Sequence, residues 1–257
     1  MAAGASPAAW RWPAPADVRP DQLPLRLEGA RWEDAEQFQA SHPSASVLKY
    51  VEDRGGDLYV VERPSAVHEG VAFSLSRELT KWAVRNSVPP QLTLLPSYNL
   101  EGVWPRRVGG RLHEADCGWA SRRALKAAPD PGATGLHLVL EAAVGQSLEA
   151  AEAKVRRVWF AADDYGPSLA VVVKVDVCGS GHGVRALLLS RHSEAPLVDV
   201  TLGAAAGGEG EGPSLVLPLE LLYGDHAGEL APGTPAPRIA VRAISKPAFA
   251  CLEGEGG

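Results

Sequence analysis

The chain has 257 residues, a formal net charge of −6, and 46% hydrophobic against 22% charged residues. This composition is that of a globular protein with one large domain, and it excludes a low-complexity or fibrous chain. The negative charge excludes a protein that coats nucleic acid through its overall charge, although a local basic groove stays compatible with it.

The two ends of the chain differ in composition from its middle. Residues 1–24 are rich in Ala and Pro, and we expect them to be disordered. Residues 251–257 are glycine-rich, and we expect a frayed tail. Between them we expect a single α/β domain over residues 25–250, with a flexible Gly-rich loop at 203–213.

The first half of this domain shows a strand, a helix and a second strand. Residues 57–63 alternate between apolar and polar side chains, which predicts a strand. Residues 64–86 carry apolar side chains at helical spacing and predict the clearest helix of the chain. Residues 91–97 predict another strand, and a turn-rich segment leads to 109–121.

The stretch 135–150 places one carboxylate, Glu141, inside an otherwise apolar run. Leu and Ala or Val residues line both faces of the expected strand, which is typical of a strand in the middle of a sheet. Burying a lone ionised carboxylate is unfavourable by several kcal/mol unless a partner or a metal ion compensates. Glu141 is therefore the residue whose surroundings need an explanation.

A helix and several strands follow. Residues 147–166 predict a helix with Ser147 as its N-cap, and residues 168–179 predict a β-branched strand. Three further strand candidates close the chain, at 184–192, 214–224 and 238–246. The order of elements predicts an α/β fold in which a central mixed sheet is flanked by two main helices.

Two acids stand out from the solvated background of the chain. Asp116 lies between small residues at one end of an expected strand, and Glu141 follows 25 residues later in the buried strand. Two carboxylates at adjacent strand ends are suited to Mg²⁺, which prefers oxygen ligands and keeps several waters. Mn²⁺ is the expected substitute. Such a cation would activate a bound water and neutralise charge developing on a phosphate.

At these residues the layout resembles the restriction-endonuclease-like, or PD-(D/E)XK, nuclease superfamily, over roughly residues 57–178. Glu69 is the early acid of the first helix, Asp116 in "EAD" stands at the place of the Pro-Asp acid, and Glu141 in "LVLEAAVGQS" stands at the Asp/Glu-X-Lys acid. "VLEAAVGQS" followed by "VWF" is similar to a poorly characterised branch that reads "VVEVxxSxS" before a helix ending in an aromatic pair. The resemblance implies a nuclease-like core with extra C-terminal strands, and Mg²⁺-dependent phosphodiester cleavage by an endonuclease-like enzyme.

The chain departs from the family pattern at two positions. Ala115 replaces the Pro before the first acid, and Ala143 stands where the family has its catalytic Lys. Residue 143 shares a strand face with Glu141, so the missing ammonium would point into the same site. Three residues are conceivable replacements: Gln146, Lys154 and Lys174.

Each candidate residue also has a structural explanation. Asp116 is equally suited to capping backbone groups at a strand end, and Glu141 to a buried acid held by backbone N–H groups or an Arg. Glu69 lies in the first turn of its helix, where the macrodipole favours any acid. His68 falls in the apolar stripe of that helix and is expected to be a core histidine.

A local excess of basic residues surrounds Asp116. The residues that could contact a phosphate backbone of DNA or RNA are Arg106, Arg107, Arg111, Arg122, Arg123 and Lys126. A solvated charged hairpin is the alternative for the same residues.

The three cysteines, Cys117, Cys178 and Cys251, are far apart and form no Cys-x-x-Cys spacing, which argues against a zinc site or a disulfide framework. The N-terminus shows no secretory signal pattern, and no apolar run approaches the roughly 18 residues of a membrane helix. We therefore expect an intracellular protein, cytoplasmic or nuclear.

The sequence is compatible with three hypotheses for function. The first is a metal-dependent nuclease, the second a catalytically inactive module of the same fold that binds or scaffolds, and the third a protein-interaction domain in which both acids are structural. The absence of a Lys at position 143 favours the second, whereas the two retained acids favour the first.

Overall fold

The structure is a computed structural model that describes residues 25–27, 49–52, 58–62, 66–96, 106–108, 111–113, 115–127, 136–144, 146–161, 166–178, 181–203 and 212–246. The chain divides into two units, residues 1–65 and 66–257. The expected disordered tail at 1–24 and the frayed end at 251–257 lie outside the described residues, as does most of the loop at 203–213.

The first unit contains a small antiparallel sheet. Its strands are β1 (Leu25–Leu27), β2 (Lys49–Glu52) and β3 (Leu58–Glu62), in the order β1-β3-β2. The predicted strand at 57–63 is therefore confirmed as β3, in the centre of this sheet.

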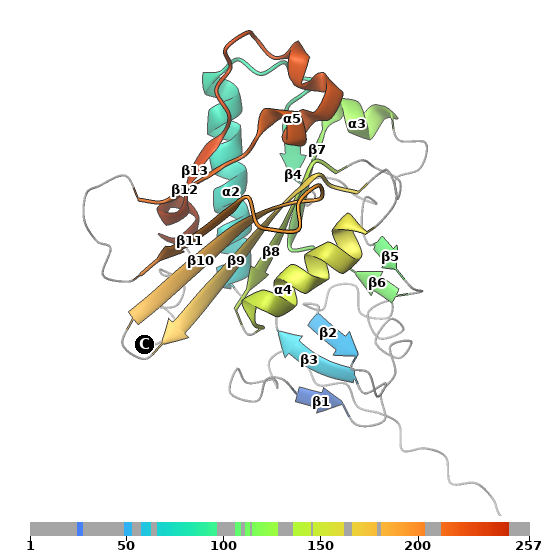
Figure 1. The fold of residues 1–257 in the computed structure, drawn as a ribbon, viewed down its shortest axis with the longest axis vertical. Helices are drawn as coiled ribbons and strands as arrows, with labels where there is room; N and C mark the ends of the chain where they lie inside the picture. Colours follow the sequence, from blue (N-terminus) through green and yellow to red (C-terminus); the bar gives the residue numbers. More distant parts are fainter. Residues whose placement is uncertain are drawn as a thin grey trace, which may run out of the picture. The chain divides into compact units, whose positions relative to one another are not determined.

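The second unit is built on a six-stranded mixed sheet with the order β11-β10-β9-β8-β7-β4 (Figure 1). The strands are, in chain order, β4 (Leu94–Pro96), β7 (Cys117–Ser121), β8 (Leu138–Ala143), β9 (Leu169–Cys178), β10 (Gly181–Ser190) and β11 (Val198–Leu202). Strand β8 pairs in parallel with β9, and every other pairing in this sheet is antiparallel. The predicted α/β class with a central mixed sheet is confirmed.

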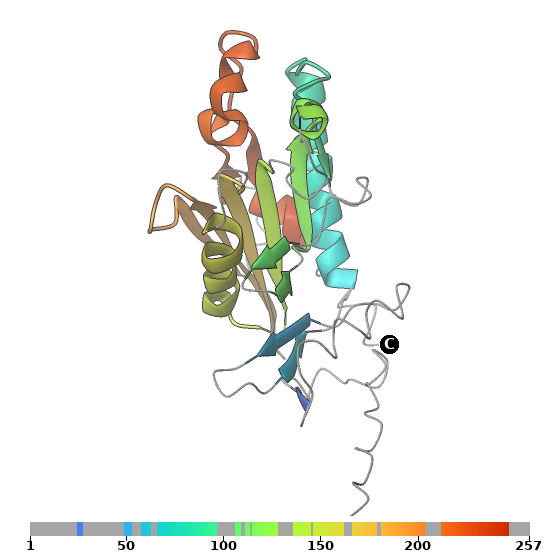
Figure 2. The ribbon, with the colours of Figure 1, turned by 90° about the vertical axis from the view of Figure 1, so that its right-hand side faces the viewer.

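Helices cover both faces of this sheet, as Figures 1 and 2 show. Helix α2 (Ala66–Arg85) packs on one face, where Val71, Leu75 and Leu79 join Leu138 and Leu140 of β8 in one apolar core. Helix α4 (Leu148–Lys154) and the wider turn η5 (Val155–Phe160) that continues it pack on the other face. Because β8 alternates its side chains between the two faces, its residues are buried throughout, as the continuous apolar run predicts.

The remaining elements are short. Helix α3 (Arg122–Ala127) follows β7 directly, β5 (Arg106–Val108) pairs with β6 (Arg111–His113), and β12 (Ser214–Val216) pairs with β13 (Arg238–Ala240). Helix α5 (Leu219–Tyr223) and the tighter turn η6 (Gly224–Glu229) lie between β12 and β13 in the chain. No helix among the described residues is long and apolar enough to cross a membrane.

Some predicted elements differ from the structure at their C-terminal ends. The strand predicted at 214–224 ends at Val216, because Pro218 fixes its φ at −59° and the Leu-rich residues after it form helix α5. The strand predicted at 238–246 ends at Ala240, and residues 241–246 are helical. Strand β11 was not predicted, although its inward-facing apolar residues alternate with exposed Asp199 and Thr201.

Candidate functional site

Glu141 lies in the middle of β8 with no solvent exposure. Its neighbours on the same face are Val139 and Ala143, which belong to the apolar core under α4. The Lys154 ammonium donates to Oε2 over 2.8 Å, and the indole Nε1 of Trp159 donates to Oε1 over 2.9 Å. Each carboxylate oxygen thus has a protein donor, which compensates for the loss of water on burial.

The local shape of the following helix explains how both donors reach one carboxylate. Ser147 caps α4 by accepting from the N–H of Ala150, as predicted. The helix then widens into η5, where the N–H of Ala161 bonds the carbonyl of Arg156, five residues earlier. Residues five apart, such as Lys154 and Trp159, diverge on an α-helix but share a face where the turn is this wide. Helical periodicity alone did not predict this widening.

Asp116 immediately precedes β7 and is partly buried. Its Oδ2 accepts from the N–H of Ala142 over 2.5 Å, and its own N–H donates to the carbonyl of Leu140 over 3.1 Å. Because Cys117 is paired with Leu140, Asp116 lies beside Glu141 on the adjacent strand. The two predicted acids are therefore neighbours across the β7–β8 pair, and Asp116 caps a backbone group there, as its structural explanation requires.

The other residues predicted for this centre lie in different surroundings. Gln146 is partly buried between β8 and α4, one residue before the N-cap. Glu69 is exposed in the first turn of α2, on the helix that covers the opposite face of the sheet from α4. Lys174 donates to the carbonyl of Val144 over 2.7 Å and forms an ion pair with Asp176 at 3.5 Å. Of the three candidate replacements for the missing Lys, Lys154 is the one that bonds Glu141.

The geometry of Glu141 bears directly on the predicted Mg²⁺ site. A cation bound by Asp116 and Glu141 would require a Glu141 oxygen that faces the ion, whereas both oxygens face protein donors in a position closed to solvent. Across the part of the chain that the structure describes, no three His, Cys, Asp or Glu side chains form an arrangement that could hold a metal ion. In this arrangement both Glu141 oxygens already accept from protein donors, and the Mg²⁺ site stays a prediction.

The predicted nucleic-acid contacts fall into two groups. Arg106 and Arg107 belong to β5 and Arg111 to β6, and their side chains lie outside the described residues. Arg122, Arg123 and Lys126 belong to α3, where Arg122 and Lys126 are exposed one helical turn apart. Arg123 instead forms an ion pair with Glu229 of η6.

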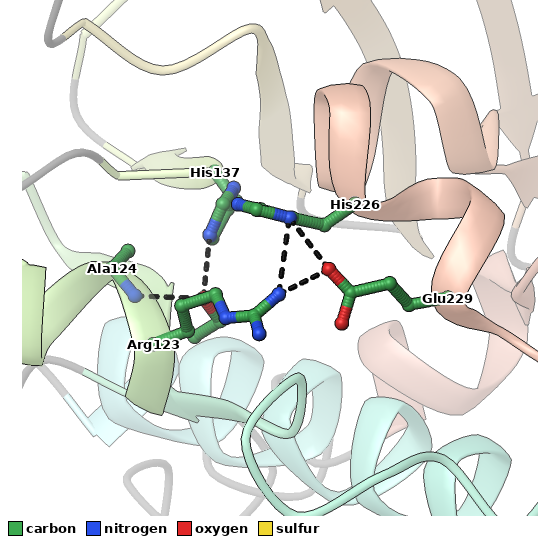
Figure 3. Close-up of polar contacts among 6 residues, drawn as sticks. Arg123, Ala124, His137, His226 and Glu229 are labelled. Atoms are coloured by element: carbon green, nitrogen blue, oxygen red, sulfur yellow. Dashed lines mark hydrogen bonds and ion pairs between the residues drawn. The ribbon is translucent and has the colours of Figure 1, made fainter.

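A second cluster of polar side chains lies at the other end of β7 and β8, and Figure 3 shows its members. Ser121, the last residue of β7, is buried, and its Oγ lies 3.0 Å from His137 Nε2 while accepting from the N–H of Ala124. Burial, with the nearby charge of His226 as a second cause, lowers the pKa of His137 from 6.5 to about 4. His137 is therefore neutral at pH 7.

Elements far apart in the sequence complete this cluster. The ring of Tyr223 from α5 lies 6.1 Å from that of His137 and stacks on Trp82 of α2 at 6.3 Å. The Nδ1 atom of His226 lies 3.2 Å from Arg123 Nη1 and 2.9 Å from Glu229 Oε1. The strand pairing would place Ser121 near His137, but no sequence signal connects either residue to His226, 89 residues beyond His137.

Comparisons of this chain with family models, with curated proteins and with solved structures yield no match.

Proposed function

We propose that this chain is a non-hydrolytic module of the restriction-endonuclease-like fold, which binds nucleic acid without cleaving it. The observation that carries the non-hydrolytic part is the state of Glu141. Its two oxygens accept from Lys154 and Trp159 in a position without solvent exposure, so the acid acts as part of the core.

The order of elements supports the nuclease-like fold. Helix α2 is followed by β4, β7 and β8, which form an antiparallel run, and then by α4 and the parallel strand β9. This is the layout that the resemblance implies: a helix, a hairpin region, two acid-bearing strands, a helix and one more strand. Asp116 and Glu141 occupy neighbouring strands of it, as the two acids of the motif must.

Helix α3 supports the binding part of the proposal. Arg122 and Lys126 present two exposed cationic groups one turn apart, in a chain whose net charge is −6. Phosphate groups are the natural partners of such a pair, and the arginine-rich strands β5 and β6 precede it in the chain.

Hydrolysis at the same residues is the second candidate function, and one observation favours it. Lys154 brings an ammonium within 2.8 Å of Glu141, and so provides from the helix the group that Ala143 lacks. This candidate requires Glu141 to release Lys154 or Trp159 before it can contact a cation.

A cleavage assay separates the two candidates. The full chain would be incubated with single- and double-stranded DNA and RNA in Mg²⁺ or Mn²⁺, beside Asp116→Asn, Glu141→Gln and Lys154→Met. Arg185→Met is the control, since Arg185 belongs to an exposed ion pair with Asp199 on β10 and β11. We expect no cleavage above that of a protein-free blank. Divalent-dependent cleavage that is lost in folded Glu141→Gln and Lys154→Met, but kept in Arg185→Met, would establish hydrolysis instead.

Fluorescence anisotropy with labelled DNA and RNA tests the binding part. In Arg122→Ala/Lys126→Ala, the slope of log K against log salt should fall by about 1.8, since each lost phosphate contact removes about 0.9. The matched control, Arg77→Ala/Lys81→Ala, removes the same charge from α2. Equal losses in the two double variants, or no binding by the unaltered chain, would contradict nucleic-acid binding through α3.

A further inference from the structure

The segment from 224 to 233, called the lid segment below, joins α5 to the loop before β13. It begins and ends at glycines with positive φ, 54° at Gly224 and 80° at Gly233. These backbone conformations are unfavourable for other residues, so the chain changes direction sharply at both ends of the segment. The η6 turn within it contains no buried residue, and Leu230 is the lid segment's one buried side chain.

Polar contacts hold this segment to α3. Arg123 donates to Glu229, and the Nδ1 atom of His226 contacts both the guanidinium and the carboxylate (Figure 3). The side chains of Arg123, His226 and Glu229 are 40%, 43% and 38% exposed, respectively. Exposed ion pairs of this kind are weak, so the connection between α3 and the lid segment is readily broken.

The position of the hydrogen on the His226 ring determines whether Nδ1 bonds Arg123 or Glu229. Without a proton on Nδ1, His226 accepts from Arg123; with one, it donates to Glu229 three residues along the same turn. A hydrogen on Nδ1 therefore pairs His226 with Glu229 within η6, and its absence pairs His226 with Arg123 of α3.

The Ser121–His137 pair lies next to these groups. Among the described residues, Tyr223 from α5 and His226 from η6 are the titratable groups that act on His137, and Arg123 from α3 and Glu229 from η6 contact His226 in turn. A positive charge on His137 would be unfavourable where the ring is buried away from water, which is the main cause of its lowered pKa. The closed arrangement therefore depends on His137 staying neutral.

We propose that residues 224–233 form an acid-sensitive lid, which closes over the Ser121–His137 pair at neutral pH and opens as the pH falls. Opening returns His137 to water, where its pKa rises from about 4 towards 6.5. In the open state His137 then binds a proton at pH values where it stays neutral in the closed state. By linkage, the ratio of closed to open molecules falls about 20-fold between pH 7 and pH 5.

Hydrogen–deuterium exchange of the full chain, followed by mass spectrometry and corrected for the intrinsic rate at each pH, tests the lid. Amides of residues 224–233 should lose protection about 20-fold from pH 7 to pH 5. They should also be less protected than the amides of β9 and β10 at both pH values, because they open without global unfolding. Equal protection in the lid segment and in these strands would overturn the proposal.

Two variants test whether His137 causes the acid sensitivity of the lid and whether Glu229 holds the lid closed. His137→Gln keeps a group able to bond Ser121 but does not titrate, so the pH dependence of lid exchange should fall below about twofold. Glu229→Gln weakens the connection to Arg123, so the lid should exchange faster already at pH 7, whereas Arg185→Met should leave it unchanged. A pH dependence that persists in His137→Gln, or lid exchange at pH 7 that is the same in Glu229→Gln as in the unaltered chain, would refute the mechanism.

Discussion

Removing the ammonium from Lys154 tests whether the Glu141 network is structural. In Lys154→Met the aliphatic part of the side chain is kept, but the carboxylate of Glu141 stays buried and loses the charged donor, while the bond from Trp159 is kept. Removing one partner of a buried ion pair typically destabilises a protein by 3–5 kcal/mol. Because the Trp159 bond remains and Lys154 itself is 19% exposed, we expect the lower end of this range, about 3 kcal/mol.

An exposed ion pair with two hydrogen bonds of similar length, between Arg185 and Asp199, provides the control. Arg185 contacts Asp199 over 2.6 Å, close to the 2.8 Å of the Lys154–Glu141 pair. The side chains of Arg185 and Asp199 are, however, 44% and 41% exposed. Arg185→Met should therefore lower the free energy of unfolding much less than Lys154→Met does. The two variants differ in the burial of the broken pair rather than in its length.

Urea and thermal unfolding, followed by circular dichroism, measure the difference. About 3 kcal/mol corresponds to a loss of roughly 6–12 °C in Tm for a unit of this size, against a few degrees for the control. A double-mutant cycle with Glu141→Gln should give a coupling free energy above about 1.5 kcal/mol, whereas the Arg185–Asp199 cycle should give a much smaller coupling. Equal destabilisation by Lys154→Met and Arg185→Met would show that Glu141 is solvated and would refute the buried network.

Three further measurements follow from the same contacts. Trp159→Phe keeps a six-membered aromatic ring but removes the five-membered ring that carries the donor to Glu141 Oε1, and it should lower the free energy of unfolding in urea by at least about 1–3 kcal/mol; a loss below about 0.5 kcal/mol would contradict the bond. Ser147→Ala removes the N-cap of α4 and should cost about 1 kcal/mol by thermal unfolding, whereas Ser193→Ala, outside any helix, should be nearly neutral. Because the pKa of His137 is lowered from 6.5 to about 4, the unfolded chain binds the proton first, so stability is complete above pH 6.5 and falls towards pH 4 by at most about 3 kcal/mol; opening of the lid limits this loss, because the open form binds the same proton. Urea titrations across this range should show that slope, and an unchanged slope in His137→Gln would assign it to other groups.

The strand around Glu141 was predicted correctly because the apolar pattern that indicates it is local in the sequence. A continuous apolar run on both faces of a strand indicates a central position, and β8 is indeed buried over its whole length between β7 and β9. Pairing of β7 with β8 then brings Asp116 beside Glu141, as two acids on adjacent strands require. Helix α2 and the cap at Ser147 were predicted from equally local patterns.

The partners of Glu141 could not be chosen from the sequence. Lys154 was one of three conceivable replacements for the missing Lys, and its selection depends on the widened turn η5, which periodicity does not encode. The contacts of Arg123 could likewise not be predicted from the sequence, because Glu229 and His226 come from a turn about a hundred residues further along the chain. Local patterns place elements, whereas side-chain partners depend on how distant elements pack.

The two clusters lie at opposite ends of the same strand pair, and this separation makes their roles independent. From His137 to Glu141 is four residues along β8, about 13 Å at about 3.3 Å per residue. Substitutions further apart than about 7–10 Å, with no shared partner, usually add within about 0.5 kcal/mol. Lys154→Met should therefore leave the pH dependence of the lid unchanged, and His137→Gln should leave the Lys154–Glu141 coupling unchanged. A change of either kind would mean that β8 transmits an effect between its ends, and the chain would then contain one coupled site instead of two.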